Sequence, residues 1–124
     1  MKKISILVAA VSIILAVILF FFSLQSERIG RLDGFASCLK DKGAVFYGAF
    51  WCSHCKRQKD LFEGSAKLLN YIECSTPDGK SQTQVCKDKQ IQSYPTWFFA
   101  NESSASGELS LKDLSDRTTC SLPK

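Results

Sequence analysis

Two cysteines, Cys52 and Cys55, stand between an apolar run over residues 44–50 and a charged, helix-prone segment. That order predicts a strand, then a pair of thiols, then a helix. A thiol at a helix start faces unpaired backbone N–H groups and the positive end of the helix dipole, and both favour the thiolate. We therefore expect a redox-active pair in which Cys52 is the exposed nucleophile and Cys55 is the resolving thiol that closes the disulfide.

Three neighbouring residues are candidate modulators of the pair. His54 can add positive charge or a hydrogen bond, Ser53 can cap the N-terminus of the helix, and Trp51 directly precedes the first thiol.

Other uses of a C-x-x-C pair fit this sequence less well. A zinc site usually needs a second ligand pair, but the chain has one His and no other C-x-x-C. Haem attachment needs His directly after the second Cys, where Lys56 stands. Metal delivery is disfavoured because there is no Met-rich or His-rich tract. We expect no metal and no cofactor besides the redox-active disulfide, and an inert structural disulfide is the remaining alternative.

Residues 4–22 are nearly all apolar and are long enough to cross a hydrocarbon core as a helix. Lys2 and Lys3 precede them, so we expect the rest of the chain to face outward. A cleaved signal peptide is the alternative, but the run is longer than a usual h-region and ends without a small-x-small cleavage site. The expected organisation is a cytoplasmic stub (1–3), a transmembrane anchor (4–22), a linker (23–30) and a folded domain (31–124).

The composition fits an exported domain. All six cysteines lie beyond the predicted anchor, and an even count in an exported chain indicates an oxidising compartment. We therefore expect a single-pass protein of the inner membrane whose domain lies in the periplasm or an equivalent exoplasmic or luminal space. The net charge is +4, with basic and acidic residues interleaved, so no nucleic-acid partner is expected.

Helical and strand patterns alternate along the domain. The expected helices cover residues 31–42, a stretch after the thiols with a break at Gly64 and a second piece capped by Ser65, residues 82–90, and residues 110–118. The expected strands cover residues 44–50, 70–74, 97–99 and 108–110, with a polar turn over 101–107. Pro95 lies at the entry of the third strand, where it removes no central hydrogen bond of the sheet. A trans-Pro turn and a cis-Pro loop beside the dithiol are both open readings.

Four segments in order (43–52, 71–74, 84–87 and 93–97) resemble the thioredoxin-like domain that is fused to, or partners, bacterial homologues of vitamin K epoxide reductase. The resemblance covers about residues 30–120. It implies an α/β thioredoxin-like fold, with a small central mixed sheet flanked by helices and the usual first strand missing.

The resemblance also implies roles for individual residues. Cys52 and Cys55 would be the redox pair, and a cis Pro95, with Tyr94, would bind the substrate chain. The other four cysteines would form the disulfides Cys38–Cys120 and Cys74–Cys86. Spacing alone leaves three pairings open, and one pair acting as a second redox relay is an alternative.

The sequence departs from the family pattern at two places. Many thioredoxins carry a buried acid six positions before the first thiol, where this chain has Phe46. Water, Glu63 or Lys59 would then have to assist deprotonation of Cys55. Disulfide-donating oxidants typically have Pro-His between the thiols and reducing thioredoxins have Gly-Pro, so the pair Ser53–His54 keeps half of the oxidant pattern.

These observations predict a membrane-tethered thiol–disulfide oxidoreductase. It would pass disulfides to exported proteins that carry thiols or disulfides, and a vitamin K epoxide reductase-like membrane protein would reoxidise it. The alternatives are an exported disulfide reductase or isomerase, and a non-catalytic thioredoxin-like binding module.

Overall fold

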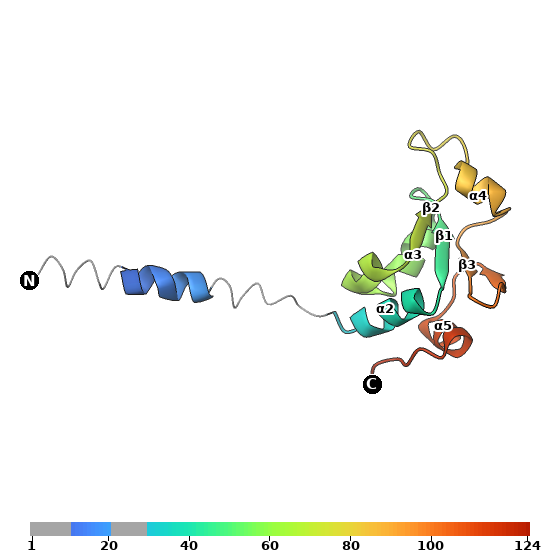
Figure 1. The fold of residues 1–124 in the computed structure, drawn as a ribbon. Helices are drawn as coiled ribbons and strands as arrows, with labels where there is room; N and C mark the ends of the chain where they lie inside the picture. Colours follow the sequence, from blue (N-terminus) through green and yellow to red (C-terminus); the bar gives the residue numbers. More distant parts are fainter. Residues whose placement is uncertain (1–10, 21–29) are drawn as a thin grey trace, which may run out of the picture.

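The computed structural model describes residues 11–20 and 30–124 (Figure 1). Within residues 30–124 the helices are α2 (Asp33–Asp41), α3 (Ser53–Asp60), the 3₁₀ helix η1 (Glu63–Leu68), α4 (Gln84–Asp88) and α5 (Leu111–Thr118). The strands are β1 (Val45–Gly48), β2 (Tyr71–Glu73), β3 (Thr96–Phe98) and β4 (Ser104–Ser106).

The predicted membrane anchor falls largely on residues that the structure does not describe. Residues 11–20 are helical, whereas 4–10, 21 and 22 lie outside the described residues, as do the stub at 1–3 and the linker at 23–29. Within the described ranges, no helix is both long enough and apolar enough to cross a membrane. The anchor stays a prediction.

The four strands form one mixed sheet in the order β2-β1-β3-β4. β1 is parallel to β2 and antiparallel to β3, and β3 is antiparallel to β4. The central strand β1 therefore has hydrogen-bonded neighbours on both edges, which suits its uninterrupted apolar sequence.

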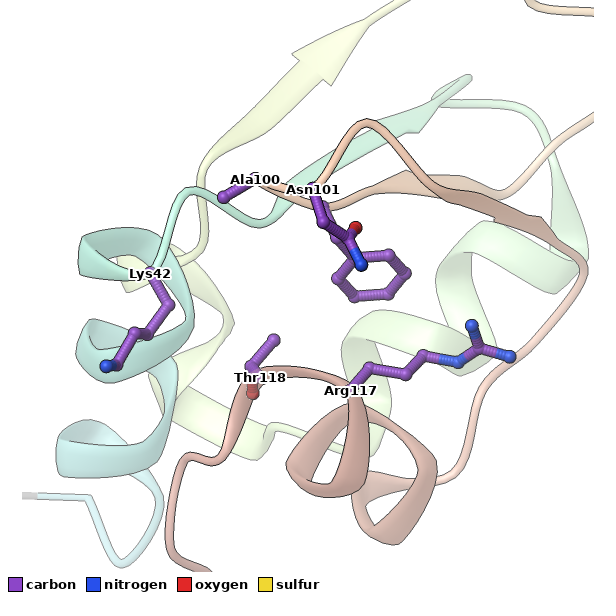
Figure 2. Close-up of a pocket in the computed structure, with 6 residues that line it drawn as sticks. Lys42, Ala100, Asn101, Arg117 and Thr118 are labelled. Atoms are coloured by element: carbon purple, nitrogen blue, oxygen red, sulfur yellow. The ribbon is translucent and has the colours of Figure 1, made fainter.

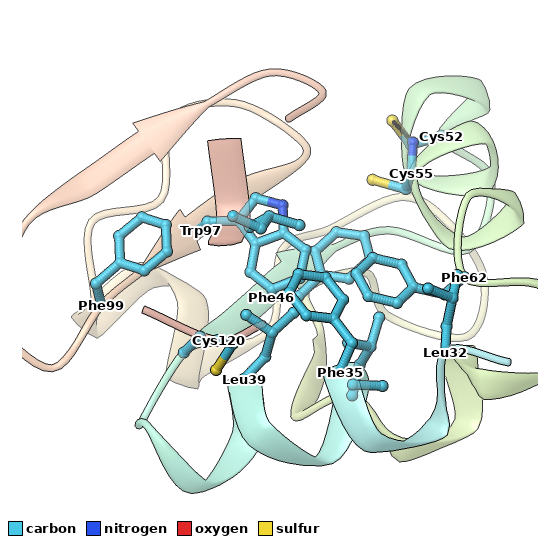
Figure 3. Packing of buried hydrophobic residues seen from close by; sticks show 14 of the residues in the cluster. Leu32, Phe35, Leu39, Phe46, Cys52, Cys55, Phe62, Trp97, Phe99 and Cys120 are labelled. Carbon is cyan, nitrogen blue, oxygen red and sulfur yellow. Dashed lines mark hydrogen bonds between the residues drawn. The ribbon is translucent and has the colours of Figure 1, made fainter. Parts of the chain in front are cut away.

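The main core lies on the face of the sheet that Phe46 and Trp97 share (Figure 3). Their rings stack with centroids 4.9 Å apart, and the ring of Phe62 lies beside Trp97 at 6.4 Å. α2 contributes Phe35 and Leu39 to the same cluster. A smaller cluster on the Tyr47 face packs against α4, so helices flank the sheet on both sides.

The hairpin at the sheet edge closes earlier than predicted. The sequence indicated a turn over 101–107 and a strand over 108–110, but β4 is Ser104–Ser106. Phe99 N–H donates to the carbonyl of Ser103, and Glu102 takes a positive φ of 63°, so the turn is complete within a few residues. The serine-rich strand has no apolar alternation, which explains why the pattern missed it.

The helix after the thiols breaks before Gly64. α3 ends at Asp60, and η1 starts at Glu63, whose φ of 51° is positive. This reversal inserts Phe62, which is fully buried, into the core. Ser65 is buried inside η1 and does not cap it, since the N-cap residue is Phe62 without a side-chain hydrogen bond.

Two disulfides cross-link the domain. Cys38 of α2 is bonded to Cys120 after α5, and Cys74 after β2 is bonded to Cys86 of α4. These are the pairings that the family resemblance implies. The first joins residues 82 positions apart and the second joins residues 12 positions apart.

Candidate functional site

The two remaining cysteines lie at the N-terminus of α3, above the aromatic core (Figure 3). Cys52 is the N-cap residue, and its sulfur accepts a hydrogen bond from the backbone N–H of Cys55 at 3.4 Å. The predicted cap, Ser53, is instead the first residue of the helix. The sulfur of the first cysteine thus occupies the position where a capping oxygen usually satisfies a free N–H group.

Cys52 is less exposed than predicted. Cys52 is 9% exposed to solvent, and Cys55 is 1% exposed. The thiol of Cys52 points at the carbonyl oxygen of Tyr94, 3.8 Å from its sulfur, so the loop before β3 covers much of it. Cys52 is still the more accessible of the two thiols.

The loop that covers Cys52 has a defined conformation. The Tyr94–Pro95 peptide bond is cis, and Pro95 is almost fully buried. The carbonyl oxygen of Pro95 accepts a hydrogen bond from the N–H of Gly107 at 2.8 Å. The cis-proline loop that the resemblance implies therefore lies directly beside the first thiol.

Cys55 is enclosed by β1, β2 and its own helix. Burial raises the pKa of its thiol to about 12, and the neighbouring Cys52 adds to this, while backbone hydrogen bonding at Ala49 and the positive charge of Lys59 oppose it. At neutral pH the thiol is therefore protonated. Gly48 leaves it room, because a Cβ there would lie 2.9 Å from the Cys55 sulfur.

No acid lies at the position of Phe46, whose ring is buried between Trp97 and Tyr71. Of the two side chains predicted to replace it, Glu63 faces Arg31 at the surface. The other, Lys59, lies near enough for its charge to lower the pKa of Cys55, and its Nζ is 3.4 Å from the centre of the Tyr71 ring.

A polar pair near Cys55, Tyr71 and Glu73, was not predicted from the sequence. The hydroxyl of Tyr71 donates a hydrogen bond to Oε2 of Glu73 at 2.7 Å. The sequence did contain a signal for this pair, because Tyr71 and Glu73 are two positions apart in a predicted strand, and such residues face the same side of the sheet.

The rim of the site contains the remaining predicted modulators. Nδ1 of His54 lies 2.6 Å from a carboxylate oxygen of Glu108, and Nη2 of Arg57 lies 2.7 Å from the same oxygen. Hydrogen bonds from Arg57 and His54 hold the pKa of Glu108 below its usual range. Trp51 is over half exposed, and its indole N–H donates to Oγ of Ser75 at 2.8 Å.

Two hollows lie on the surface of the domain. One of about 190 Å³ is formed between the ends of α2, β3 and α5 and shares no residue with the dithiol (Figure 2). The other, of about 400 Å³, is lined by Lys59, Ala66, Lys67, Leu69 and Tyr71, and so borders the site. Among residues 11–20 and 30–124, no three His, Cys, Asp or Glu side chains are grouped to hold a metal ion.

A mixed sheet, a helix that begins at a dithiol and a facing cis-proline loop together define a thioredoxin-like protein. The sequence matches the thioredoxin family over residues 33–117, and the chain belongs to this family. The predicted α/β thioredoxin-like fold is thereby confirmed.

The curated relatives carry names from thiol–disulfide chemistry. The chain is 47% identical over 92 residues to "Thiol-disulfide oxidoreductase LTO1" of Arabidopsis thaliana, which covers 70% of this chain and 24% of that protein. It is 31% identical over 71 residues to "Protein disulfide-isomerase 5-1" of the same plant, covering 52% of this chain and 49% of that one. A rice protein, "Protein disulfide isomerase-like 5-1", is 32% identical over 71 residues, covering 52% and 48%.

The chain thus spans about a quarter of the length of the first relative and about half of the other two. The prediction of a thioredoxin-like enzyme of thiol–disulfide exchange is confirmed to this extent: the domain is of the thioredoxin family, and its relatives are named as such enzymes.

Proposed function

We propose that the chain is a thiol–disulfide oxidoreductase whose reacting groups are Cys52 and Cys55. The observation that carries this proposal is the position of the Cys52 sulfur. It caps α3 at 3.4 Å from a backbone N–H, and it lies 3.8 Å from the Tyr94 carbonyl of the cis-proline loop. The backbone N–H group and the helix dipole stabilise negative charge on that sulfur, which is the charge of both the nucleophile and the leaving group in disulfide exchange.

In the oxidising direction the reaction begins with a Cys52–Cys55 disulfide. A substrate thiolate attacks the Cys52 sulfur, the bond between the two cysteines breaks, and its electron pair goes to the Cys55 sulfur, which takes up a proton. A second substrate thiolate then attacks the substrate sulfur of the mixed disulfide and releases Cys52 as a thiolate. The substrate loses two electrons and two protons. The enzyme gains the two electrons and one proton at Cys55, and the second proton goes to solvent or to the Cys52 thiolate.

Substrate binding is proposed at the loop before β3. The residues on either side of the cis bond, Tyr94 and Pro95, lie beside the Cys52 sulfur, so their backbone is in reach of a chain bonded to that sulfur. An extended substrate segment would bind there like an added strand. Trp51, whose ring meets that of Tyr94 edge-on at 6.0 Å, offers an exposed apolar surface next to it.

We further propose that the protein is exported and tethered to the inner membrane by residues 4–22, with its domain in the periplasm or an equivalent space. The apolar composition of that segment, preceded by Lys2 and Lys3, supports the tether. The two disulfides support the location, because such bonds persist in oxidising compartments.

A vitamin K epoxide reductase-like membrane protein is the proposed partner that reoxidises the dithiol. The support is the resemblance of the segments at 43–52, 71–74, 84–87 and 93–97 to the domains that work with such proteins. A tether that holds the domain at the membrane surface would keep it close to such a partner.

The names of the isomerase relatives favour a second candidate, an exported disulfide isomerase or reductase. The redox potential of the dithiol separates the two, since it is about −120 mV in strong oxidants, about −180 mV in protein disulfide isomerase and about −270 mV in thioredoxin. A non-catalytic binding module is less favoured, because both cysteines of the redox pair are present at the start of α3.

Trapping tests the proposed function. In a Cys55→Ala variant expressed in its host, the mixed disulfide through Cys52 has no resolving thiol, so covalent complexes with substrate proteins should accumulate and dissolve on reduction. The double variant Cys52→Ala/Cys55→Ala is the matched control. Absence of any complex specific to the single variant would contradict catalysis by this pair.

A further inference from the structure

Cys55 is a buried thiol that must lose its proton whenever it closes the disulfide. The position beneath it that an acid would occupy holds Phe46, which is fully buried in the aromatic core. Glu63, the acidic candidate from the sequence, faces Arg31 at the surface. A carboxylate that accepts the proton of Cys55 therefore has to come from another element.

Tyr71 of β2 is a polar side chain whose ring edge lies near this thiol. A Cβ built on Gly48 would lie 2.9 Å from the Cys55 sulfur and 2.9 Å from Cε2 of Tyr71, so sulfur and ring edge are within about 6 Å of each other. The Tyr71 ring is half-buried against Phe46, edge to face at 5.1 Å. The packing of the core thus fixes the ring beside the thiol.

The hydroxyl of Tyr71 is bonded to a carboxylate that the fold holds in place. It donates to Oε2 of Glu73 at 2.7 Å, while Oε1 of Glu73 accepts from the N–H groups of Phe50 at 3.2 Å and Ser75 at 2.8 Å. These two N–H groups belong to the loops that flank the dithiol. Glu73 is only half-buried, so its proton can exchange with solvent.

We propose that the Tyr71–Glu73 pair replaces the missing acid and accepts the proton of Cys55, an inference that rests on the proposed function. Through a water molecule in the cavity beside Tyr71, the Cys55 S–H proton passes to the Tyr71 oxygen as the hydroxyl proton of Tyr71 passes to Oε2 of Glu73. The resulting Cys55 thiolate attacks the Cys52 sulfur of the mixed disulfide and expels the partner as a thiolate. Glu73 then releases its proton to solvent or to that thiolate, so charge and protons balance.

The charges around the site agree with this route. Burial raises the pKa of Tyr71, and the bond to Glu73 raises it further, so the tyrosine relays a proton and does not itself stay ionised. Lys59 lies over the ring at 3.4 Å, and its positive charge favours the Cys55 thiolate. The cavity of about 400 Å³ beside Tyr71 gives water access to the ring.

Stopped-flow mixing of the reduced full-length chain with dithiobis(nitrobenzoate), a chromophoric aromatic disulfide, separates the two thiols. The first nitrothiobenzoate is released when Cys52 attacks the reagent, and the second when Cys55 resolves the mixed disulfide. We expect Glu73→Gln and Tyr71→Phe to leave the first phase unchanged and to slow the second about a hundredfold at neutral pH, the usual size of general-base assistance. Both variants keep the packing, since Gln retains an acceptor for Phe50 and Ser75, and Phe retains the ring.

The pH profile distinguishes a proton relay from a structural effect. In the wild type the second phase should change little with pH near neutrality, whereas in both variants it should rise about tenfold per pH unit and approach the wild-type rate in alkali. Matched controls are Glu63→Gln, an exposed acid, and Tyr47→Phe on β1; both should keep the wild-type profile.

Three experimental outcomes would overturn either the Tyr71–Glu73 relay or the proposed function. A wild-type second phase that is proportional to hydroxide throughout overturns the relay, and so does a Glu73→Gln or Tyr71→Phe profile identical to wild type. If one of these variants does not fold, the other and the wild-type profile still decide. Failure of the wild type to release any nitrothiobenzoate from Cys52 would instead refute the proposed function.

Discussion

Cys52 and Cys55 are identical side chains in two different environments. The sulfur of Cys52 caps the N-terminus of α3, where it accepts a hydrogen bond from a backbone N–H and lies beside the cis-proline loop. The sulfur of Cys55 lies one turn into the helix, beside Gly48 and near the ring edge of Tyr71, in the core. The division of labour between nucleophile and resolving thiol thus follows from where each residue falls on the helix.

Burial of Cys55 has a measurable pH consequence. Because its pKa is raised to about 12, the thiol stays neutral as pH rises through the range where an ordinary thiol ionises. In a folded Cys52→Ala variant, the rate of iodoacetamide alkylation at Cys55 should rise about tenfold per pH unit from about pH 7 to about pH 10. In urea the same variant should level off near pH 8.5. A plateau at the same pH in both states would contradict the burial effect.

Gly48 is required by the atoms around it. An added Cβ would lie 2.9 Å from both the Cys55 sulfur and the Tyr71 ring, so Gly48→Ala should destabilise the domain by about 1–3 kcal/mol. Gly34, on the exposed side of α2 with no atom within 4 Å of its Cβ position, is the matched control. Gly34→Ala should stabilise by about 0.5–1 kcal/mol. Urea unfolding of both variants measures the difference, and equal effects would count against it.

The roles of single residues could be predicted from the sequence, but the tertiary contacts of their side chains could not. The spacing of the two thiols and the position of Pro95 could be read directly. The contact of His54 with Glu108 could not, because 54 positions separate them and no local pattern relates a loop to a helix start. The degree to which the loop at Tyr94 covers Cys52 is likewise a tertiary property.

Among the elements, α3 is fixed to the rest of the fold through one buried polar side chain. Oε1 of Gln58 accepts from the N–H of Leu109 at 2.7 Å and from the indole N–H of Trp97 at 3.3 Å, and its Nε2 donates to the carbonyl of Leu109 at 3.0 Å. The helix that carries both thiols is thereby joined to β3 and to the loop before α5.

Truncating the side chain of Gln58 should destabilise the attachment of α3 to the rest of the domain. Gln58→Ala leaves the partly buried N–H and carbonyl of Leu109 and the buried indole N–H of Trp97 without these bonds, so we expect a loss of about 3 kcal/mol in unfolding free energy. The exposed Gln92→Ala should change it by less than about 0.5 kcal/mol. Denaturant unfolding checks both values, and similar losses in the two variants would refute the assignment.

The elements with strong apolar periodicity were predictable, and the others were not. β1 and α2 bury a regular set of side chains, so the pattern found them. β4 consists of Ser104–Ser106 and exists because β3 offers it a partner, which is a non-local cause. The helix break near Glu63 depends on how Phe62 packs in the core between Phe35 and Trp97, which is a tertiary contact. The prediction placed the break at Gly64 instead, because glycine is a poor helix former.

For the whole molecule, the two disulfides compensate for a small core. The bond from Cys38 to Cys120 encloses nearly all of the domain, whereas the bond from Cys74 to Cys86 encloses one loop and a helix start. Since a cross-link stabilises mainly by restricting the unfolded chain, the longer loop should contribute more.

Removing each disulfide as a pair of alanines tests this ordering. The Cys38→Ala/Cys120→Ala variant should lose about 4.5 kcal/mol and the Cys74→Ala/Cys86→Ala variant about 3 kcal/mol in unfolding free energy. Thermal and urea unfolding under non-reducing conditions provide the values. A larger loss from the shorter loop would indicate that native packing, and not chain entropy, decides the contribution.

The most direct test of the account is a redox titration of the full-length chain in glutathione buffers, followed by acid quenching, alkylation and mass spectrometry. We predict that Cys52 and Cys55 change together between dithiol and disulfide in a single two-electron transition above about −180 mV, while the other four cysteines stay bonded. A pair that remains reduced across the titration, or that forms only separate glutathione adducts without closing its own disulfide, would contradict the central claim.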